Sequence, residues 1–301
     1  MSSARTIRLG KEHLWIAVAT LLICNSSSAE IRLQPFNDHR VIIRHSEYQA
    51  EWQIRLPEVV GDQEGTFLTY IKTPMTWREY EPGITGYDWQ PTPEYAREAF
   101  EKIGGRTPMV LGMKISPRMK VGSNRIDLWL YLKNESDKPF KAVFSDGGCL
   151  QHRTERFFDD HYERSFILTA SGITPLNQTD RSVPIRAAYF FHPAWFEEPG
   201  VKAYEYFWGR SRTRPSAALV ASESREGKGA IGIAWDQCLG VRQNSDPNHH
   251  CMHSSPYYGE IKPNQTVSRR GVILFGDTIQ DVVKQFKREK ISPYLGPPGG
   301  Q

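Results

Sequence analysis

A histidine-rich stretch near the C-terminus holds the densest group of metal-ligand residue types in the sequence. Within five residues it places His249, His250, Cys251 and His253. On an extended backbone side chains alternate between two faces, so His249, Cys251 and His253 would project from the same one. Imidazole and thiolate bind zinc or copper, although this spacing matches no standard zinc-finger signature. Three interpretations stay open: a structural loop, which the nearby polar and proline residues favour, histidines facing a substrate, or a divalent transition-metal site.

A second stretch, Asp146–Arg164, mixes histidine, arginine and carboxylate residues with aromatic ones. On a strand, His152 and Arg156 would lie on one face and Arg153 on the other. Imidazole, guanidinium and carboxylate together can position and protonate an anionic or polyhydroxylated ligand. The alternative is a solvated strand edge held by salt bridges.

Aromatic residues gather in Lys72–Pro93, a stretch interrupted by proline and glycine and without apolar periodicity. Aromatic faces pack against the C–H faces of sugar rings, and charged neighbours can bond hydroxyl groups. The alternative is that the rings close one end of a folded domain. The substrate-binding candidates are Trp77, Tyr80 and Trp89, with Arg153 from the second stretch and His192 and Trp195 as a further aromatic rim.

These residue types support two kinds of acid–base chemistry. A lyase needs a base, a charge neutraliser and an acid, which His152 or His253, Arg153 or Arg156, and Tyr257 or Tyr258 would supply. A hydrolase needs two carboxylates about 5–9.5 Å apart, for which Glu155, Asp159, Asp160 and Asp236 are candidates. If the two histidine-rich stretches share one cleft, the predicted catalytic residues are His152, Arg156, Asp236, His253 and Tyr258.

The elements that would position these residues are mostly strands. In Arg125–Lys133, apolar residues alternate with polar ones, as in a half-buried strand. A polar turn, Asn134–Pro139, leads to Phe140–Phe144, which predicts a hairpin. Further strands are expected at 40–44, 51–56, 165–169, 187–191, 217–222, 229–235 and 268–275.

Helical signals are few. A threonine and a proline precede Glu94–Ile103, and Thr278–Glu289 carries apolar residues at helical spacing. The sequence therefore predicts an all-β fold: one large antiparallel β-sandwich domain over residues 30–290 with one or two short peripheral helices, followed by a flexible tail at 291–301.

The N-terminus has the pattern of a signal peptide over residues 1–29. A basic start precedes the apolar run Leu14–Cys24, which is too short to span a bilayer, and small residues lead to Ala29. We expect cleavage after Ala29 and a secreted or periplasmic protein without a transmembrane span in the mature chain. A lipid anchor at Cys24 is the alternative, although Ile23 is bulky for it.

Three cysteines, Cys149, Cys238 and Cys251, would remain after cleavage. In an oxidising compartment, an odd number allows one disulfide or none. The shortest pairing, Cys238–Cys251, would stabilise the fold by roughly 3 kcal/mol.

Composition excludes several classes of protein. With 39% hydrophobic and 24% charged residues the chain is globular, and a formal charge of +4 is too small to indicate nucleic-acid binding. The sequence has no G-x-x-x-x-G-K-[ST], G-x-S-x-G or H-E-x-x-H motif, which disfavours nucleotide hydrolysis and lipase-type catalysis.

The turn Asn134–Pro139 between two strands, and the turn Gly259–Thr266 leading into Val267–Phe275, resemble those of large two-sheet carbohydrate-active proteins. The nearest architecture is the galactose-mutarotase-like supersandwich. This resemblance implies a carbohydrate ligand and an exported protein that processes a polysaccharide or oligosaccharide. A non-catalytic carbohydrate-binding or envelope-structural sandwich, with histidines serving stability or a metal, is the second hypothesis.

Overall fold

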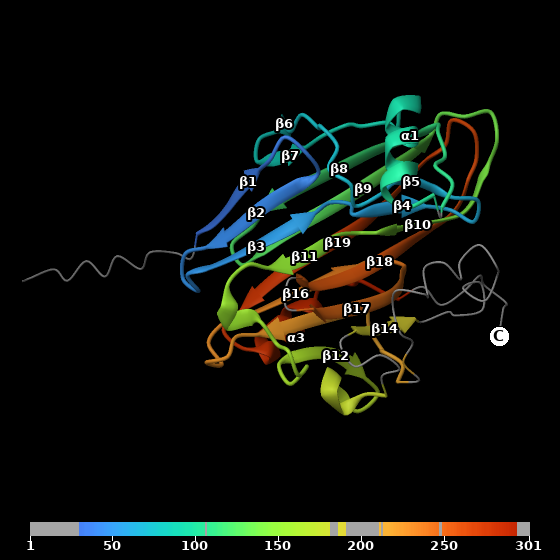
Figure 1. The fold of residues 1–301 in the computed structure, drawn as a ribbon. Coiled ribbons are helices and arrows are strands. Elements are labelled where there is room, and N and C mark those ends of the chain that lie inside the picture. The colour runs from blue at the N-terminus through green and yellow to red at the C-terminus, as the bar shows by residue number, and fades with distance from the viewer. Residues whose placement is uncertain are drawn as a thin grey trace, which may run out of the picture.

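Alternating apolar and polar residues build two antiparallel sheets whose apolar faces pack against each other (Figure 1). The computed structural model describes residues 30–105, 107–180, 186–190, 211, 213–246 and 249–293, with only the backbone of 186–190. The predicted all-β sandwich is confirmed for these residues.

The first sheet has ten strands among the described residues. Its main path runs β1-β2-β3-β11-β18-β10-β4-β5, and β17 joins β18 to β14. The strands are β1 (Ile31–Pro35), β2 (Arg40–His45), β3 (Ala50–Arg55), β4 (Val59–Gly61), β5 (Thr66–Leu68), β10 (Phe140–Asp146), β11 (Cys149–His152), β14 (Arg186–Phe190), β17 (Cys238–Asp246) and β18 (His249–Ile261).

The second sheet has nine strands in the part of the chain that the structure describes, in the order β13-β12-β15-β16-β19-β9-β8-β7-β6. They are β6 (Arg78–Glu81), β7 (Ile84–Gly86), β8 (Met113–Val121), β9 (Arg125–Asn134), β12 (Ser165–Thr169), β13 (Gly172–Pro175), β15 (Leu219–Glu223), β16 (Ala230–Trp235) and β19 (Thr266–Gly276).

Two short α-helices lie at the periphery, as predicted. Helix α1 (Pro93–Lys102) begins after Thr92, whose side chain accepts a hydrogen bond from the N–H of Tyr95. Helix α3 (Ile279–Phe286) begins with a capping box between Thr278 and Asp281. The apolar face of α3 packs against the second sheet and forms a smaller core there. Two 3₁₀ turns, η1 (Glu155–Phe157) and η2 (Leu176–Gln178), are the remaining elements of the described residues.

The core between the sheets is large and rich in aromatic residues. Trp52 and Trp235 are fully buried in it, together with Phe157 and Phe275. Gly271 and Gly147 lie directly against the indole of Trp235, where even a Cβ atom would approach within 2.5 Å. The two glycines therefore make room for the largest side chain of this part of the core.

The predicted hairpin between residues 125–133 and 140–144 is wrong. Both segments are strands, but β9 pairs with β8 and β19, whereas β10 pairs with β18 and β4 in the other sheet. Asn134 holds the turn by donating hydrogen bonds to the carbonyls of Lys138 and Ile261. The polar turn thus crosses between the two sheets instead of closing a local pair.

The loop expected around residues 249–258 is also wrong. Here β17 and β18 form a long antiparallel pair, and the polar residues that favour a loop lie on a sheet face. The structure does confirm the extended backbone that would place alternate residues on one face.

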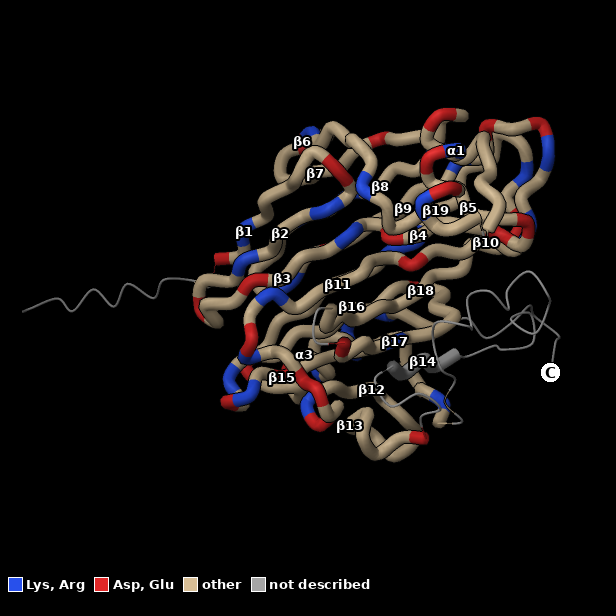
Figure 2. The backbone as a smooth tube through the Cα atoms, viewed as in Figure 1, with Lys and Arg blue, Asp and Glu red and all other residues tan. Residues whose placement is uncertain are grey.

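The described helices include none long and apolar enough to cross a membrane. Lys and Arg are interspersed with Asp and Glu along the described backbone (Figure 2). The expected leader at 1–29 and most of the expected tail lie outside the described residues.

Candidate functional site

Polar and charged side chains lie buried on the face of the first sheet that points away from the core. In β18, Met252 and Tyr258 point into the core and Ser254 bonds the backbone of Trp235. Alternation therefore directs Cys251 and His253 to the opposite, outer face. We call the group on this face the outer-face cluster; it comprises Arg55, Glu58, Asp146, Cys149, Arg242, His249, Cys251, His253 and Ser255.

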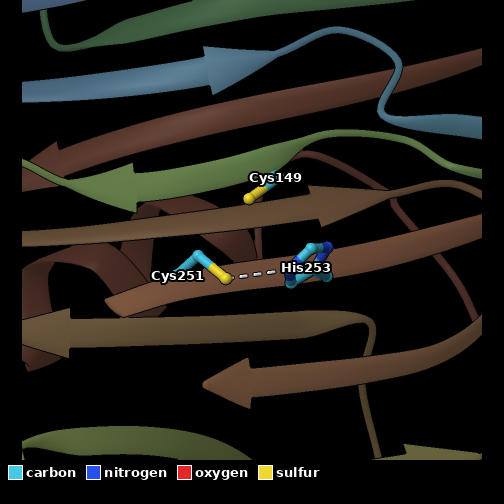
Figure 3. A group of neighbouring side chains, drawn as sticks. All are labelled: Cys149, Cys251 and His253. Carbon is cyan, nitrogen blue, oxygen red and sulfur yellow. Dashed lines mark hydrogen bonds between the residues drawn. The ribbon is translucent and has the colours of Figure 1, made fainter. Parts of the chain in front are cut away.

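The imidazole of His253 lies at the centre of the outer-face cluster. Its Nε2 atom is 3.0 Å from Sγ of Cys251 (Figure 3). Its Nδ1 atom is 3.6 Å from Oε2 of Glu58 and 3.8 Å from Oδ1 of Asp146. The ring therefore has sulfur on one side and carboxylates on the other.

Strand β11 brings a second sulfur to the same place. Because Gln151 lies opposite Cys251 and Leu150 opposite Met252, the register brings Cys149 beside His253. Ligand atoms of Cys149, Cys251 and His253 lie within 4.8 Å of one another. His249 contributes a further nitrogen, with Nε2 3.4 Å from Sγ of Cys149.

A buried ion pair stands beside these ligand atoms. The Arg242 guanidinium pairs with the Asp146 carboxylate and donates to Oγ of Ser255 over 3.1 Å, and Ser255 donates to Asp146 over 2.8 Å. Arg242 is 1% exposed, and burial lowers its pKa to about 9. Burying a charge without a partner costs several kcal/mol, so the buried carboxylate of Asp146 depends on its pairing with Arg242.

The pKa values of the two thiols in the outer-face cluster shift in opposite directions. Burial alone would raise the pKa of Cys251, but hydrogen bonding from Cys149 and the neighbouring His253 and His249 hold it well below its ordinary value. Burial and the adjacent Cys251 raise the pKa of the Cys149 thiol well above its ordinary value. One proton shared between two neighbouring sulfurs accounts for both directions.

The accessible rim of the cluster is the ion pair between Arg55 and Glu58. Nη1 of Arg55 donates to Oε1 of Glu58 over 2.8 Å, with side-chain exposures of 21% and 11%. On the same face, Gln53 donates to Gln151 over 3.3 Å. The face thus offers charged groups and neutral amides side by side, which suits a ligand with many hydroxyl groups.

The structure brings the predicted metal ligands near one another, and their role in metal binding stays a prediction. Cys251 and His253 meet directly, and His249 lies close to Cys149. Sequence reasoning missed Cys149, Glu58, Asp146 and Arg242. Cys149 could have been considered as a ligand, because it is one of only three cysteines outside the expected leader. No local sequence pattern marked Glu58, Asp146 or Arg242, because contacts between segments far apart in the chain bring them together.

The disulfide expected between Cys238 and Cys251 is absent, since all three cysteines of the described chain are free thiols. Cys238 lies opposite Pro256 and Cys251 opposite Asn244, so the two cysteines are separated by about 20 Å along the strand pair. They also point to opposite faces, because Cys238 lies in the core.

The residues predicted to be catalytic do not gather around one described cleft, and their roles stay predictions. His152 and Tyr258 are buried in the core, whereas His253 belongs to the outer-face cluster. Arg156 donates to the carbonyls of Tyr48 and Lys228, and Asp236 accepts from Ser292.

The two histidine-rich stretches nevertheless touch. Nε2 of His250 is 2.8 Å from Oδ1 of Asp160, and the imidazole stacks on Phe158 with ring centroids 4.4 Å apart. His250 lies next to Cys251 in sequence but on the other face of β18. This contact ties the η1 segment to β18 without adding to the outer-face cluster.

The predicted substrate-binding residues are also dispersed. Trp77 packs on the core and donates to the carbonyl of Asp38, Trp89 packs on Tyr95, and Arg153 is exposed. His192 and Trp195 lie outside the described residues.

Tyr80 lines a groove of about 560 Å³ on the outer face of the second sheet. Trp129 and the half-exposed Tyr131 lie in the same groove, together with Arg118 and Asp88. Arg118 lies over the ring of Tyr80 at 3.3 Å and bonds Asp88. The groove combines aromatic faces with charged groups.

No family model and no curated protein matches this chain. Among solved structures, similar ones include the Slr1438 protein from Synechocystis sp. PCC 6803, with a TM-score of 0.47, 6% identity and coverage of 83% of this chain and 96% of that chain. A galactose mutarotase-like protein from Lactobacillus casei has a TM-score of 0.46 and 8% identity, covering 82% and 100%. A galactose mutarotase related enzyme from Lactobacillus acidophilus has a TM-score of 0.42 and 9% identity, covering 83% and 99%. The predicted resemblance to galactose-mutarotase-like proteins is thus confirmed, and at these TM-scores it assigns no substrate or residue role.

Proposed function

We propose that this chain is a carbohydrate-active protein that binds and processes its ligand at the outer-face cluster. One observation carries the proposal: ionised and neutral polar side chains are buried together on a sheet face that points away from the core. A buried polar network of this kind costs free energy, and perturbed, desolvated groups concentrate at functional sites. The leader pattern over residues 1–29 supports an exported location.

The composition of the face supports a polyhydroxylated ligand. Guanidinium and carboxylate groups bond hydroxyls strongly, and the neighbouring Gln53 and Gln151 amides both donate and accept. Oxygens of Glu58 and Asp146 lie within 4.8 Å of each other. Two neighbouring carboxylates are the pair of groups that a glycoside hydrolase requires. An imidazole beside an arginine would equally suit a lyase.

A screen of the purified protein against polysaccharides and oligosaccharides tests the proposal, with reducing ends and the absorbance of unsaturated uronates as readouts. We expect Glu58→Gln to lower turnover by about 100-fold or more, because it removes a proton-transferring carboxylate at the rim. Arg44→Gln is the matched control, since Arg44 lies on the same face but is half exposed and pairs with Glu51. Absence of binding and turnover with every carbohydrate, or unchanged turnover in Glu58→Gln, would overturn the proposal.

The groove on the second sheet favours a second candidate, non-catalytic carbohydrate binding. Trp129 and Tyr131 offer aromatic faces beside the charged Arg118 and Asp88. Under this alternative, Tyr131→Ala weakens oligosaccharide binding, whereas Tyr70→Ala, which removes an exposed ring that does not line the groove, leaves binding unchanged. Calorimetric titration of both variants separates the two candidates.

A further inference from the structure

We propose that Cys149, Cys251 and His253 bind a soft transition-metal ion, with zinc as the expected ion. The inference goes beyond the proposed carbohydrate function and does not depend on it. These side chains come from two adjacent strands, and all three are at most 1% exposed. Figure 3 shows both sulfurs and the imidazole converging on one region of the sheet.

The spacing of the donor atoms fits one ion. Zinc binds sulfur at about 2.3 Å and nitrogen at about 2.0–2.1 Å, so donors around a tetrahedral ion lie roughly 3.3–3.8 Å apart. Sγ of Cys251 and Nε2 of His253 are 3.0 Å apart, and all three donors lie within 4.8 Å of one another. Small side-chain rotations are therefore enough to close the set around a metal.

The other nitrogen of His253 supports the same assignment. Ligand histidines normally direct their second N–H to a carboxylate, which fixes the ring and its tautomer. Here Nδ1 faces Glu58 and Asp146 at 3.6 and 3.8 Å, while Nε2 faces the sulfur. The carboxylates of Glu58 and Asp146 are thus placed to fix the orientation of the His253 ring as a metal ligand.

His249 is a candidate donor for a fourth position. Its Nε2 atom is 3.4 Å from Sγ of Cys149, and it lies on the same face of β18 as the other two β18 ligands. Two sulfurs and imidazole nitrogens select zinc or monovalent copper over magnesium and calcium, which prefer oxygen. On binding, both sulfurs coordinate the metal as thiolates, and the proton that the two sulfurs share is released to solvent.

Metal analysis of the full chain, purified without affinity histidines or chelators and then dialysed with zinc, tests the inference. We expect about one equivalent of zinc, and on cobalt substitution a sulfur-to-cobalt charge-transfer absorption. Cys149→Ser and Cys251→Ser should each bind less than a tenth of an equivalent. Cys238→Ser is the matched control, because that buried thiol bonds Gly240 and Ser254 away from the cluster.

Glu58→Gln keeps all the proposed metal ligands and tests the contribution of the carboxylate beside Nδ1 of His253. It should weaken zinc affinity by about 10–100-fold in competition with a chelator. Circular dichroism establishes that each variant is folded. Less than a tenth of an equivalent in the folded wild type, equal zinc in the folded Cys251→Ser variant, or a Cys149–Cys251 disulfide in the non-reduced protein would each overturn the inference. Since no carbohydrate is present, these outcomes are independent of the proposed function.

Discussion

Trp52 and His152 meet in the core between the two sheets, where the indole Nε1–H lies 3.2 Å from Nδ1 of the imidazole and donates to it. This hydrogen bond requires Nδ1 to be unprotonated, so the ring is neutral in the folded protein. Burial, followed by the nearby His250, lowers the pKa of His152 to about 3.

Acid should therefore destabilise the protein well before its carboxylates titrate. Burial also lowers the pKa of His39 to about 4. Both folded-state pKa values lie below the ordinary 6.5, so below that pH the unfolded chain takes up protons that the folded chain rejects. Each histidine then removes up to about 1.4 kcal/mol of stability per pH unit, down to its folded pKa.

Replacing His152 by Asn isolates one of these contributions. The amide oxygen can still accept from Trp52 but does not titrate, so the loss of stability between pH 6 and pH 4 should be shallower than in wild type. Denaturant unfolding at several pH values measures it. An unchanged slope would show that His152 is protonated in the folded state.

Adding one methyl group beside Trp235 should be costly. A Cβ at Gly271 would lie 2.5 Å from the indole, and neither β19 nor the buried ring can move away freely. We expect Gly271→Ala to destabilise the protein by about 1–3 kcal/mol through overpacking. Ser268→Ala, an exposed site on the same strand, should leave the melting temperature near that of wild type. Equal melting temperatures for both variants would contradict the packing around Trp235.

The carboxylate of Asp159 organises the segment before β12. It accepts from the N–H groups of Glu163 and Arg164 and from Oγ of Ser165, at 2.7–3.1 Å. Asp159→Ala would leave these donors unsatisfied and should cost about 1–3 kcal/mol. Asp160→Ala removes a single bond from a largely exposed carboxylate and should cost less. Thermal melts compare the neighbours, and a larger loss in Asp160→Ala would refute this role.

Removing only one member of the ion pair between Arg242 and Asp146 should cost far more stability than removing both charges. Arg242→Met leaves the carboxylate buried without its cation, at a cost of about 3–5 kcal/mol. Combining it with Asp146→Asn should restore much of that loss, because no buried charge then lacks its partner. A double variant less stable than the single one would show that the pair itself stabilises the fold.

Local pattern was sufficient to predict individual strands and both helices. The alternation of Arg125–Lys133 reports one buried face, and the cap residues before α1 and α3 mark helix starts. The local pattern was not sufficient to predict which strands pair with one another. The β9–β10 hairpin failed because a polar turn between two strands looks the same whether they share a sheet or cross between sheets.

The outer-face cluster was only half predictable for the same reason. Cys251 and His253 lie two residues apart, so alternation alone brings them to one face. Cys149 joins them only because β11 pairs with β18 across about 100 residues, which no local signal encodes. Arg242 likewise reaches the site through strand pairing, and Glu58 lies in the bend between β3 and β4.

Strand β18 pairs with β17 along one edge and with both β11 and β10 along the other. Because its side chains alternate, adding or deleting one residue at the start of β18 would exchange the two faces for the residues that follow. Met252 and Tyr258 would then turn toward solvent, and Cys251 and His253 would enter the core. A substitution on one face of this strand can therefore leave the other face intact, whereas a one-residue change in its length disturbs the core and the outer-face cluster together.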